Sequence, residues 1–229
     1  VKYVSNAFHA LKVSFANEVG RLSHALGVDS LEVMRLLCED RRLNISSAYL
    51  RPGMAFGGSC LPKDLRSLIH EARRVNVGVP LLEATIQSNE VHLKAAISRV
   101  LSMGRPMTAV VGLSFKAGTD DLRESPIVRL VEGLLGKGIP VRIYDRNVRM
   151  SALVGANREY IDRTIPHITA LISHSLADLI ADSDLIVVGK SIEGLDAALQ
   201  QSGKQQGVLD LIRRWDGQLS TDACRPIIR

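Results

Sequence analysis

The fold class is decided by the stretch Thr108-Ala109-Val110-Val111-Gly112-Leu113, which is a short apolar run. Two similar runs follow it, at residues 141–145 and 184–189. An apolar segment at helical spacing, residues 127–135, separates the first run from the second. Strands that alternate with helices form parallel sheets with right-handed crossovers. This part of the chain is therefore predicted to be an α/β domain with a Rossmann-like, doubly wound parallel sheet.

The first part of the chain has helical periodicity instead. Apolar residues recur every three or four positions over residues 1–26, and again in two later segments that open with prolines. Glycine and proline between residues 104 and 106 interrupt the pattern. We predict two domains, a central helical dimerisation region over residues 1–104 and an α/β domain over residues 105–229.

The composition argues against several classes of protein. The net charge of +5 is modest and its Lys and Arg residues are scattered, which argues against a nucleic-acid partner but suits an anionic substrate. No apolar run is long enough to cross a membrane. Three cysteines without metal-ligand spacing indicate a reducing compartment, which we take to be the cytoplasm. The six histidines are scattered and predict no metal site.

The segment around Cys60 has the features of a nucleophile's site. Cys60 follows two glycines and precedes Pro62, a residue well tolerated at the first position of a helix. A helix N-terminus favours an anion, and the charge of Lys63 favours a thiolate further. Cys60 is therefore the candidate nucleophile, although most free cysteines are small buried hydrophobic residues.

Three motifs resemble those of the nucleotide-sugar dehydrogenases, the family of UDP-glucose and GDP-mannose 6-dehydrogenases. In chain order they are Lys2-Tyr3-Val4-Ser5-Asn6-Ala7-Phe8, Gly57-Gly58-Ser59-Cys60-Leu61-Pro62-Lys63-Asp64, and the FKxxTDDxRxSP loop of residues 115–126. The resemblance implies NAD-dependent, four-electron oxidation of the C6 alcohol of a nucleotide sugar to a uronic acid, for polysaccharide precursor synthesis.

The resemblance also implies roles for individual residues. Cys60 would form a thiohemiacetal and then a thioester. Lys2 and Asn6, which share one helix face because they are four residues apart, would stabilise the oxyanion. Asp64 would orient Lys2 or the hydrolytic water. The residues implied in substrate binding are Asn44, Tyr49, Arg51, Gly57 and Lys116. Those implied in binding NAD are Lys63 and Arg123. Each also has an ordinary interpretation as a solvated charge, a core amide or a helix-terminal acid.

The usual NAD-binding turn is missing from this sequence. No G-x-G-x-x-G follows a predicted strand, and the turn after residue 113 carries Lys116 and Arg123 in place of glycines. We expect a phosphate-bearing ligand at this turn, because ligands of open α/β sheets bind at the carboxyl ends of strands. Asp145 ends a strand where a ribose-binding acid often stands, but a turn-forming aspartate is an equal alternative. The resemblance implies a preceding NAD-binding Rossmann domain, so we expect this chain alone to be inactive.

The local sequence also suggests a substrate and an assembly. Residues 44–46, the loop around Arg51 and residues 155–160 resemble the GDP-mannose branch of the family more than the UDP-glucose branch. The expected reaction is GDP-mannose to GDP-mannuronate, with a UDP-glucose or other UDP-sugar 6-dehydrogenase as the alternative. A non-catalytic module for nucleotide-sugar binding or dimerisation stays open. Apolar stripes on the first and fourth helices predict a homodimer or higher homo-oligomer.

Overall fold

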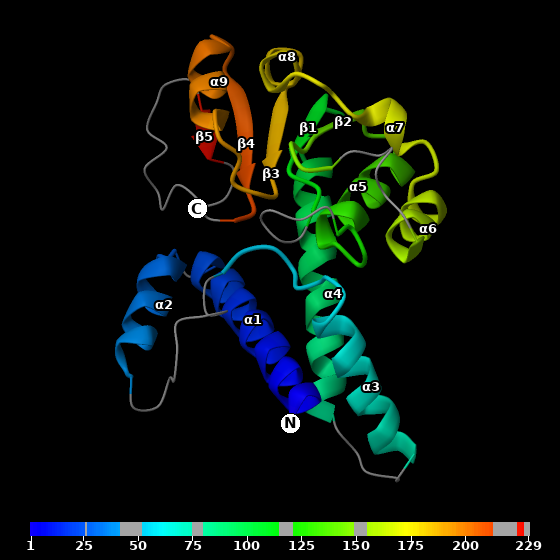
Figure 1. The fold of residues 1–229 in the computed structure, drawn as a ribbon. Coiled ribbons are helices and arrows are strands. Elements are labelled where there is room, and N and C mark those ends of the chain that lie inside the picture. The colour runs from blue at the N-terminus through cyan, green and yellow to red at the C-terminus, as the bar shows by residue number, and fades with distance from the viewer. Residues whose placement is uncertain are drawn as a thin grey trace. The chain divides into compact units, whose positions relative to one another are not determined.

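The computed structural model describes residues 1–25, 27–41, 52–74, 80–114, 121–148, 155–212 and 224–226. The chain divides into two compact units, Val1–Lys94 and Ala95–Arg229. The elements of both units are labelled in Figure 1.

The first unit is built from helices whose ends are set by local sequence. They are α1 (Lys2–Ala25), α2 (Ser30–Glu39), α3 (Leu61–Arg74) and the greater part of α4 (Pro80–Leu101). Asp29 caps α2 by accepting a hydrogen bond from the backbone N–H of Leu31 at 2.8 Å. Gly27, with φ +69°, follows α1 in the left-handed conformation that commonly ends helices.

Small residues of α1 form the core of this unit. Ala7 and Ala10 are buried against Phe56, Leu65 and Ile69, among others. Small side chains allow α1 and α3 to approach closely. Several larger apolar residues of α1, namely Val4, Phe8 and Phe15, are exposed instead, whereas Val13 packs against this core.

The second unit contains a parallel sheet, as the sequence predicts. Its strands run in the order β2-β1-β3-β4-β5, and every pair is parallel. They are β1 (Thr108–Val111), β2 (Val141–Tyr144), β3 (Leu185–Val188), β4 (Gln206–Asp210) and β5 (Cys224–Pro226). Thr108 pairs with Val141 on one side and with Leu185 on the other. The strand order therefore reverses between β1 and β3.

Helices cover both faces of this sheet (Figure 1). They are α5 (Pro126–Gly136), α6 (Gly155–Thr164), α7 (Ile168–Leu171), α8 (Leu176–Ala181) and α9 (Leu195–Gln201). The chain steps to one side from β1 to β2 through α5, and to the other side from β2 to β3 through α8. Right-handed crossovers then put α5 and α8 on opposite faces. α8 and α9 share one core with alternate strand residues, which include Ala109, Val111, Ile186 and Val188.

The ends of β1 and β3 meet backbone against backbone. Gly112 has φ +88°, and a Cβ on it would lie 2.2 Å from the Cβ of Lys190. A Cβ on Gly189 would lie 2.8 Å from the carbonyl oxygen of Gly112. Real Cβ atoms do not approach other atoms so closely, so only glycine fits at both positions. This contact leaves no gap at the place where the strand order reverses.

Candidate functional site

The first two motifs meet where α1 packs against α3. The side-chain amide of Asn6 donates a hydrogen bond to Oδ2 of Asp64. The ammonium of Lys63 lies 3.4 Å from Oδ1 of the same carboxylate. Asp64 is fully buried, whereas the Lys63 side chain is 56% exposed. The structure thus joins Asn6, Lys63 and Asp64 in one polar cluster.

Asp64 is held in its charged form. Burial raises the pKa of Asp64, but the hydrogen bond from Asn6 and the ammonium groups of Lys63 and Lys2 together lower it by more. Its pKa therefore lies below the usual value for an aspartate, and the carboxylate is ionised at neutral pH. An ionised carboxylate in this place can orient a nearby lysine.

Cys60 stands directly before α3, and its thiol is exposed. Its carbonyl oxygen accepts a hydrogen bond from the N–H of Asp64 at 2.9 Å, so the helical hydrogen-bond pattern starts at the cysteine. Gly58 has φ +81°, a conformation that favours glycine. The backbone turns there and presents the thiol at the N-terminal end of the helix.

Two buried asparagines hold the segment before Cys60. Oδ1 of Asn89 accepts from the N–H of Phe56 at 2.8 Å, and its Nδ2 donates to the carbonyl of Phe56 at 2.9 Å. Asn17 accepts from the N–H of Gly53 at 2.9 Å and donates to the carbonyl of Met54 at 3.4 Å. Each amide pairs with a backbone donor and a backbone acceptor, as a neighbouring strand would. We call these two residues the amide clamp.

The local sequence around Asn17 and Asn89 does not predict the amide clamp. Asn17 is 2% exposed and Asn89 is 7% exposed, so neither amide is solvated. Buried amides need hydrogen-bond partners. The signal in the sequence is an asparagine on the buried face of a helix, as between Ile86 and Leu93 in α4. That signal indicates a buried polar contact but does not name its partner.

The other candidate residues are divided among different parts of the chain. Gly57 is buried beside the clamped segment. Arg123, in the second unit, forms a two-point ion pair with Asp121, with distances of 2.9 Å from Nε to Oδ1 and 2.7 Å from Nη2 to Oδ2. The remaining substrate candidates lie outside the described residues: Asn44, Tyr49, Arg51 and Lys116.

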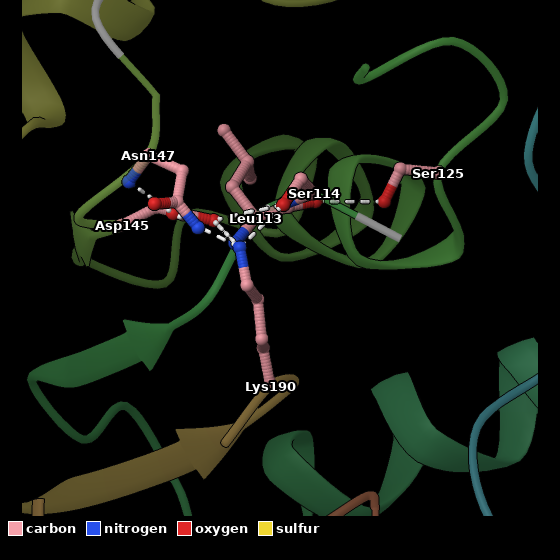
Figure 2. Close-up of polar contacts among 6 residues, drawn as sticks. All are labelled: Leu113, Ser114, Ser125, Asp145, Asn147 and Lys190. Atoms are coloured by element: carbon pink, nitrogen blue, oxygen red, sulfur yellow. Dashed lines mark hydrogen bonds and ion pairs between the residues drawn. The ribbon is translucent and has the colours of Figure 1, made fainter. Parts of the chain in front are cut away.

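A second polar cluster lies at the carboxyl ends of β1, β2 and β3 (Figure 2). Oδ2 of Asp145 accepts hydrogen bonds from the N–H groups of Leu113 at 2.8 Å and Ser114 at 3.1 Å. Its Oδ1 accepts from the N–H of Asn147 at 2.9 Å, which is the pattern of a turn-forming aspartate. The carboxylate is fully buried, and Lys190 pairs with it at 3.3 Å. The turn-forming interpretation of Asp145 is therefore correct, and the ribose-binding interpretation is wrong.

The described residues that directly follow β1 do not form an NAD site of the usual Rossmann kind. Such a site needs a glycine-rich turn at the reversal of strand order, where the pyrophosphate approaches the backbone. Here Lys190 packs against Gly112, and Asp145 is occupied by the protein's own donors.

Among the residues whose placement is described, His, Cys, Asp and Glu form no group of three or more that could hold a metal ion. Within the same part of the chain, no helix has the length and apolar character needed to span a membrane.

The sequence and fold were compared with known families. Residues 1–91 match the central domain of the UDP-glucose/GDP-mannose dehydrogenase family, and residues 109–216 match the UDP binding domain of that family. Together the two matches cover most of the chain. The chain therefore belongs to the UDP-glucose/GDP-mannose dehydrogenase family, which confirms the resemblance seen in its motifs.

Individual relatives agree with this assignment. The GDP-mannose 6-dehydrogenase of Pseudomonas putida is 45% identical over 223 residues, which are 97% of this chain and 51% of the relative. The UDP-glucose 6-dehydrogenase of Rickettsia bellii is 36% identical over 151 residues, which are 63% of this chain and 34% of the relative. The chain spans about half the length of the GDP-mannose 6-dehydrogenases it matches.

Two solved structures have the same fold. One is a ternary complex of GDP-mannose dehydrogenase from Pseudomonas aeruginosa, with a TM-score of 0.70, 43% identity and coverage of 99% of this chain and 52% of that chain. The other is a UDP-glucose dehydrogenase from Pyrobaculum islandicum, with a TM-score of 0.77, 26% identity and coverage of 100% of this chain and 50% of that chain.

The low pKa of Asp64 predicts a pH-dependent stability. A carboxylate whose pKa is lower in the folded state stabilises the fold above the ordinary aspartate pKa of about 3.9, and that contribution is lost as the pH falls through the folded-state pKa. The free energy of unfolding should therefore fall more steeply below about pH 5 in the natural chain than in Asp64→Asn. Urea unfolding followed by circular dichroism measures it, with Asp196→Asn at an exposed position as the matched control. Equal slopes in the natural chain and in Asp64→Asn would contradict the assignment.

Proposed function

We propose that the protein to which this chain belongs oxidises the C6 hydroxyl of a nucleotide sugar to a uronic acid, with NAD as the hydride acceptor. The observation that carries the proposal is the buried, ionised Asp64 with its partners Asn6 and Lys63, next to the exposed thiol of Cys60. Membership of a family of nucleotide-sugar dehydrogenases, and 45% identity to a GDP-mannose 6-dehydrogenase, support it.

Cys60 is the proposed nucleophile. A first hydride transfer to NAD would convert the C6 alcohol to the aldehyde. The Cys60 thiolate adds to this aldehyde to give a thiohemiacetal, so the half-oxidised sugar stays bound to the enzyme. A second hydride transfer to NAD would give the thioester, and water would then release the uronic acid and regenerate the thiol. The exposure of Cys60 supports this role, because an attacking sulfur must be reachable by substrate.

Asn6, Lys2 and Asp64 are proposed to stabilise and orient the reacting groups. An amide nitrogen carries two hydrogens, so Asn6 can hold Asp64 with one and offer the other to an oxyanion. Lys2 is exposed one helical turn before Asn6 and can add a positive charge. Asp64 keeps these groups in place and can align the water that attacks the thioester.

We propose two domains, residues 1–104 and residues 105–229. The sugar and its phosphates would be contacted by Asn44, Tyr49, Arg51, Gly57 and Lys116. NAD would be contacted from this chain by Lys63 and Arg123. Since no G-x-G-x-x-G follows a strand in this sequence, the isolated chain should produce no NADH.

GDP-mannose is the proposed substrate. GDP-mannose 6-dehydrogenases match 93–97% of the chain, whereas the UDP-glucose 6-dehydrogenase of Rickettsia bellii matches only 63%. A UDP-sugar is the alternative, and the family description of residues 109–216 as a UDP binding domain favours it.

A homodimer is the proposed assembly. Val4, Phe8 and Phe15 are exposed and, at their spacing, fall on one stripe of α1. Leu81 and Val91 of α4 are also exposed. Exposed apolar surface often marks a protein interface, and twofold dimers are the commonest closed assembly.

Replacement of Cys60 tests the mechanism. In a longer form of the protein that includes an NAD-binding domain, Cys60→Ala should lower uronic acid formation by at least about 10³-fold, because the covalent step is lost. Product is measured by chromatography after incubation with GDP-mannose and NAD. Cys38→Ala, at the half-buried cysteine of α2, is the matched control and should retain activity. Acid formation at the natural rate by Cys60→Ala would remove Cys60 from the mechanism.

Nucleotide binding tests the substrate. In calorimetry with the 229-residue chain, GDP should bind more tightly than UDP. A site that hydrogen-bonds one ligand rejects an analogue that leaves its polar groups unpaired. Lys116→Ala should weaken the binding of both nucleotides, whereas Lys204→Ala, at an exposed ion pair with Asp184, should weaken neither. Tighter or equal binding of UDP would overturn the choice of GDP-mannose and leave the broader dehydrogenase class.

The mass of the chain in solution tests the assembly. Light scattering at micromolar concentration should give twice the mass of the 25.0 kDa chain. Phe8→Glu should shift the mass toward the monomer, because it places a charge in the apolar stripe. Reversal of the charge at the exposed Lys137 of the second unit (Lys137→Glu) is the control and should leave the mass unchanged. A monomeric natural chain would refute the dimer.

A further inference from the structure

Lys190 is a buried lysine outside the proposed catalytic cluster. It follows β3 by two residues and its side chain is 8% exposed. Lysines are almost never buried unless they are paired. The ammonium of Lys190 donates to Oγ of Ser114 at 2.7 Å and lies 3.3 Å from Oδ1 of Asp145 (Figure 2).

This contact joins three strand ends at one point. Ser114 follows β1, Asp145 follows β2 and Lys190 follows β3. Asp145 already holds the backbone N–H groups of Leu113 and Ser114, and Lys190 binds both the carboxylate and the serine hydroxyl. The place where the chain leaves β1 is therefore fixed by a charged, solvent-excluded network.

The return of the same loop is fixed as well. The hydroxyl of Ser125 donates to the carbonyl of Leu113 at 2.8 Å, which ties the start of α5 to the end of β1 (Figure 2). The N–H of Leu122 donates to Oδ1 of Asn157 at 2.9 Å. Both described ends of the loop that carries Lys116 are thus anchored by buried hydrogen bonds.

We propose that Lys190 is a positioning residue for nucleotide binding, which acts through Asp145 and Ser114 on the segment that carries Lys116. The proposal rests on the proposed function of this loop. Lys116 is two residues beyond Ser114 in the sequence, and two residues of chain span at most about 7 Å, so the position of Ser114 limits where Lys116 can lie. The side chain of Lys190 is 8% exposed and donates to Ser114 and Asp145, so its proposed role is positioning.

Loss of the ammonium would act in two ways. Asp145 would keep its backbone donors but lose its counter-ion while it is fully buried, which is costly for a carboxylate. The unneutralised charge would also stand near the segment that has to accept a phosphate. Both effects weaken the binding of a nucleoside diphosphate.

The test is GDP binding to the 229-residue chain, measured by calorimetry. Lys190→Met should weaken binding by about tenfold or more, the size of coupling found between residues of one charged network. Lys190→Arg keeps the charge and should restore most of the affinity. Lys204→Met is the matched control, because it removes a lysine from an exposed ion pair with Asp184 at 2.9 Å, and it should have no effect. Unchanged affinity in Lys190→Met would overturn the proposal.

A double-mutant cycle separates positioning from general destabilisation. If Lys190 acts through Lys116, then Lys190→Met added to Lys116→Ala should cost less than about twofold in GDP affinity. A domain that is merely less stable would lose affinity equally in both backgrounds, and that result would refute the proposal.

A second variant covers the case in which Lys190→Met does not fold. If circular dichroism shows that Lys190→Met does not fold, Ser114→Ala replaces it, because it removes only the hydroxyl that Lys190 contacts. It should weaken GDP binding by about threefold, and no loss would overturn the proposal. If the natural chain binds neither GDP nor UDP, the proposed function fails together with this inference. If it binds GDP and only the Lys190 effects are absent, the inference fails alone.

Discussion

The close contact between the ends of β1 and β3 is the constraint on which the second unit depends. The strand order reverses there, and a backbone-to-backbone approach is possible only because Gly112 and Gly189 lack side chains. In dinucleotide-binding sheets such a reversal leaves a crevice for a pyrophosphate. In this chain the two glycines admit Lys190, whose ammonium ties the segment after β1 to the segment after β2.

Both units contain a buried carboxylate that is paired with a lysine, but the two lysines differ in exposure. In each, a fully buried carboxylate joins segments that are far apart in the sequence, and a lysine neutralises it. The side chain of Lys190 is 8% exposed and serves only the protein, whereas that of Lys63 is 56% exposed and keeps a side open to solvent. Burial therefore separates a structural lysine from one that is available to a ligand.

The sequence predicts those features whose cause is local. The strands β1 and β3 are apolar runs, and β2 has Val141 and Ile143 at alternate positions. The cap at Asp29 and the helix start at Pro80 depend on neighbouring residues. β4 is not predictable in this way, because it contains only two adjacent large apolar residues, Val208 and Leu209. The partners of Asp145 and Asn89 lie tens of residues away, so their roles follow only from the tertiary structure.

The amide clamp limits which residues the chain can carry at two buried positions. A peptide group offers one donor and one acceptor at a fixed separation, and a side chain must match both to replace a strand partner. At position 89 aspartate offers only acceptors, leucine offers neither group and glutamine places its amide one carbon too far. Positions 17 and 89 should therefore vary as little during evolution as a catalytic residue does. Their invariance would reflect the shape of the polypeptide backbone and not the chemistry of the reaction.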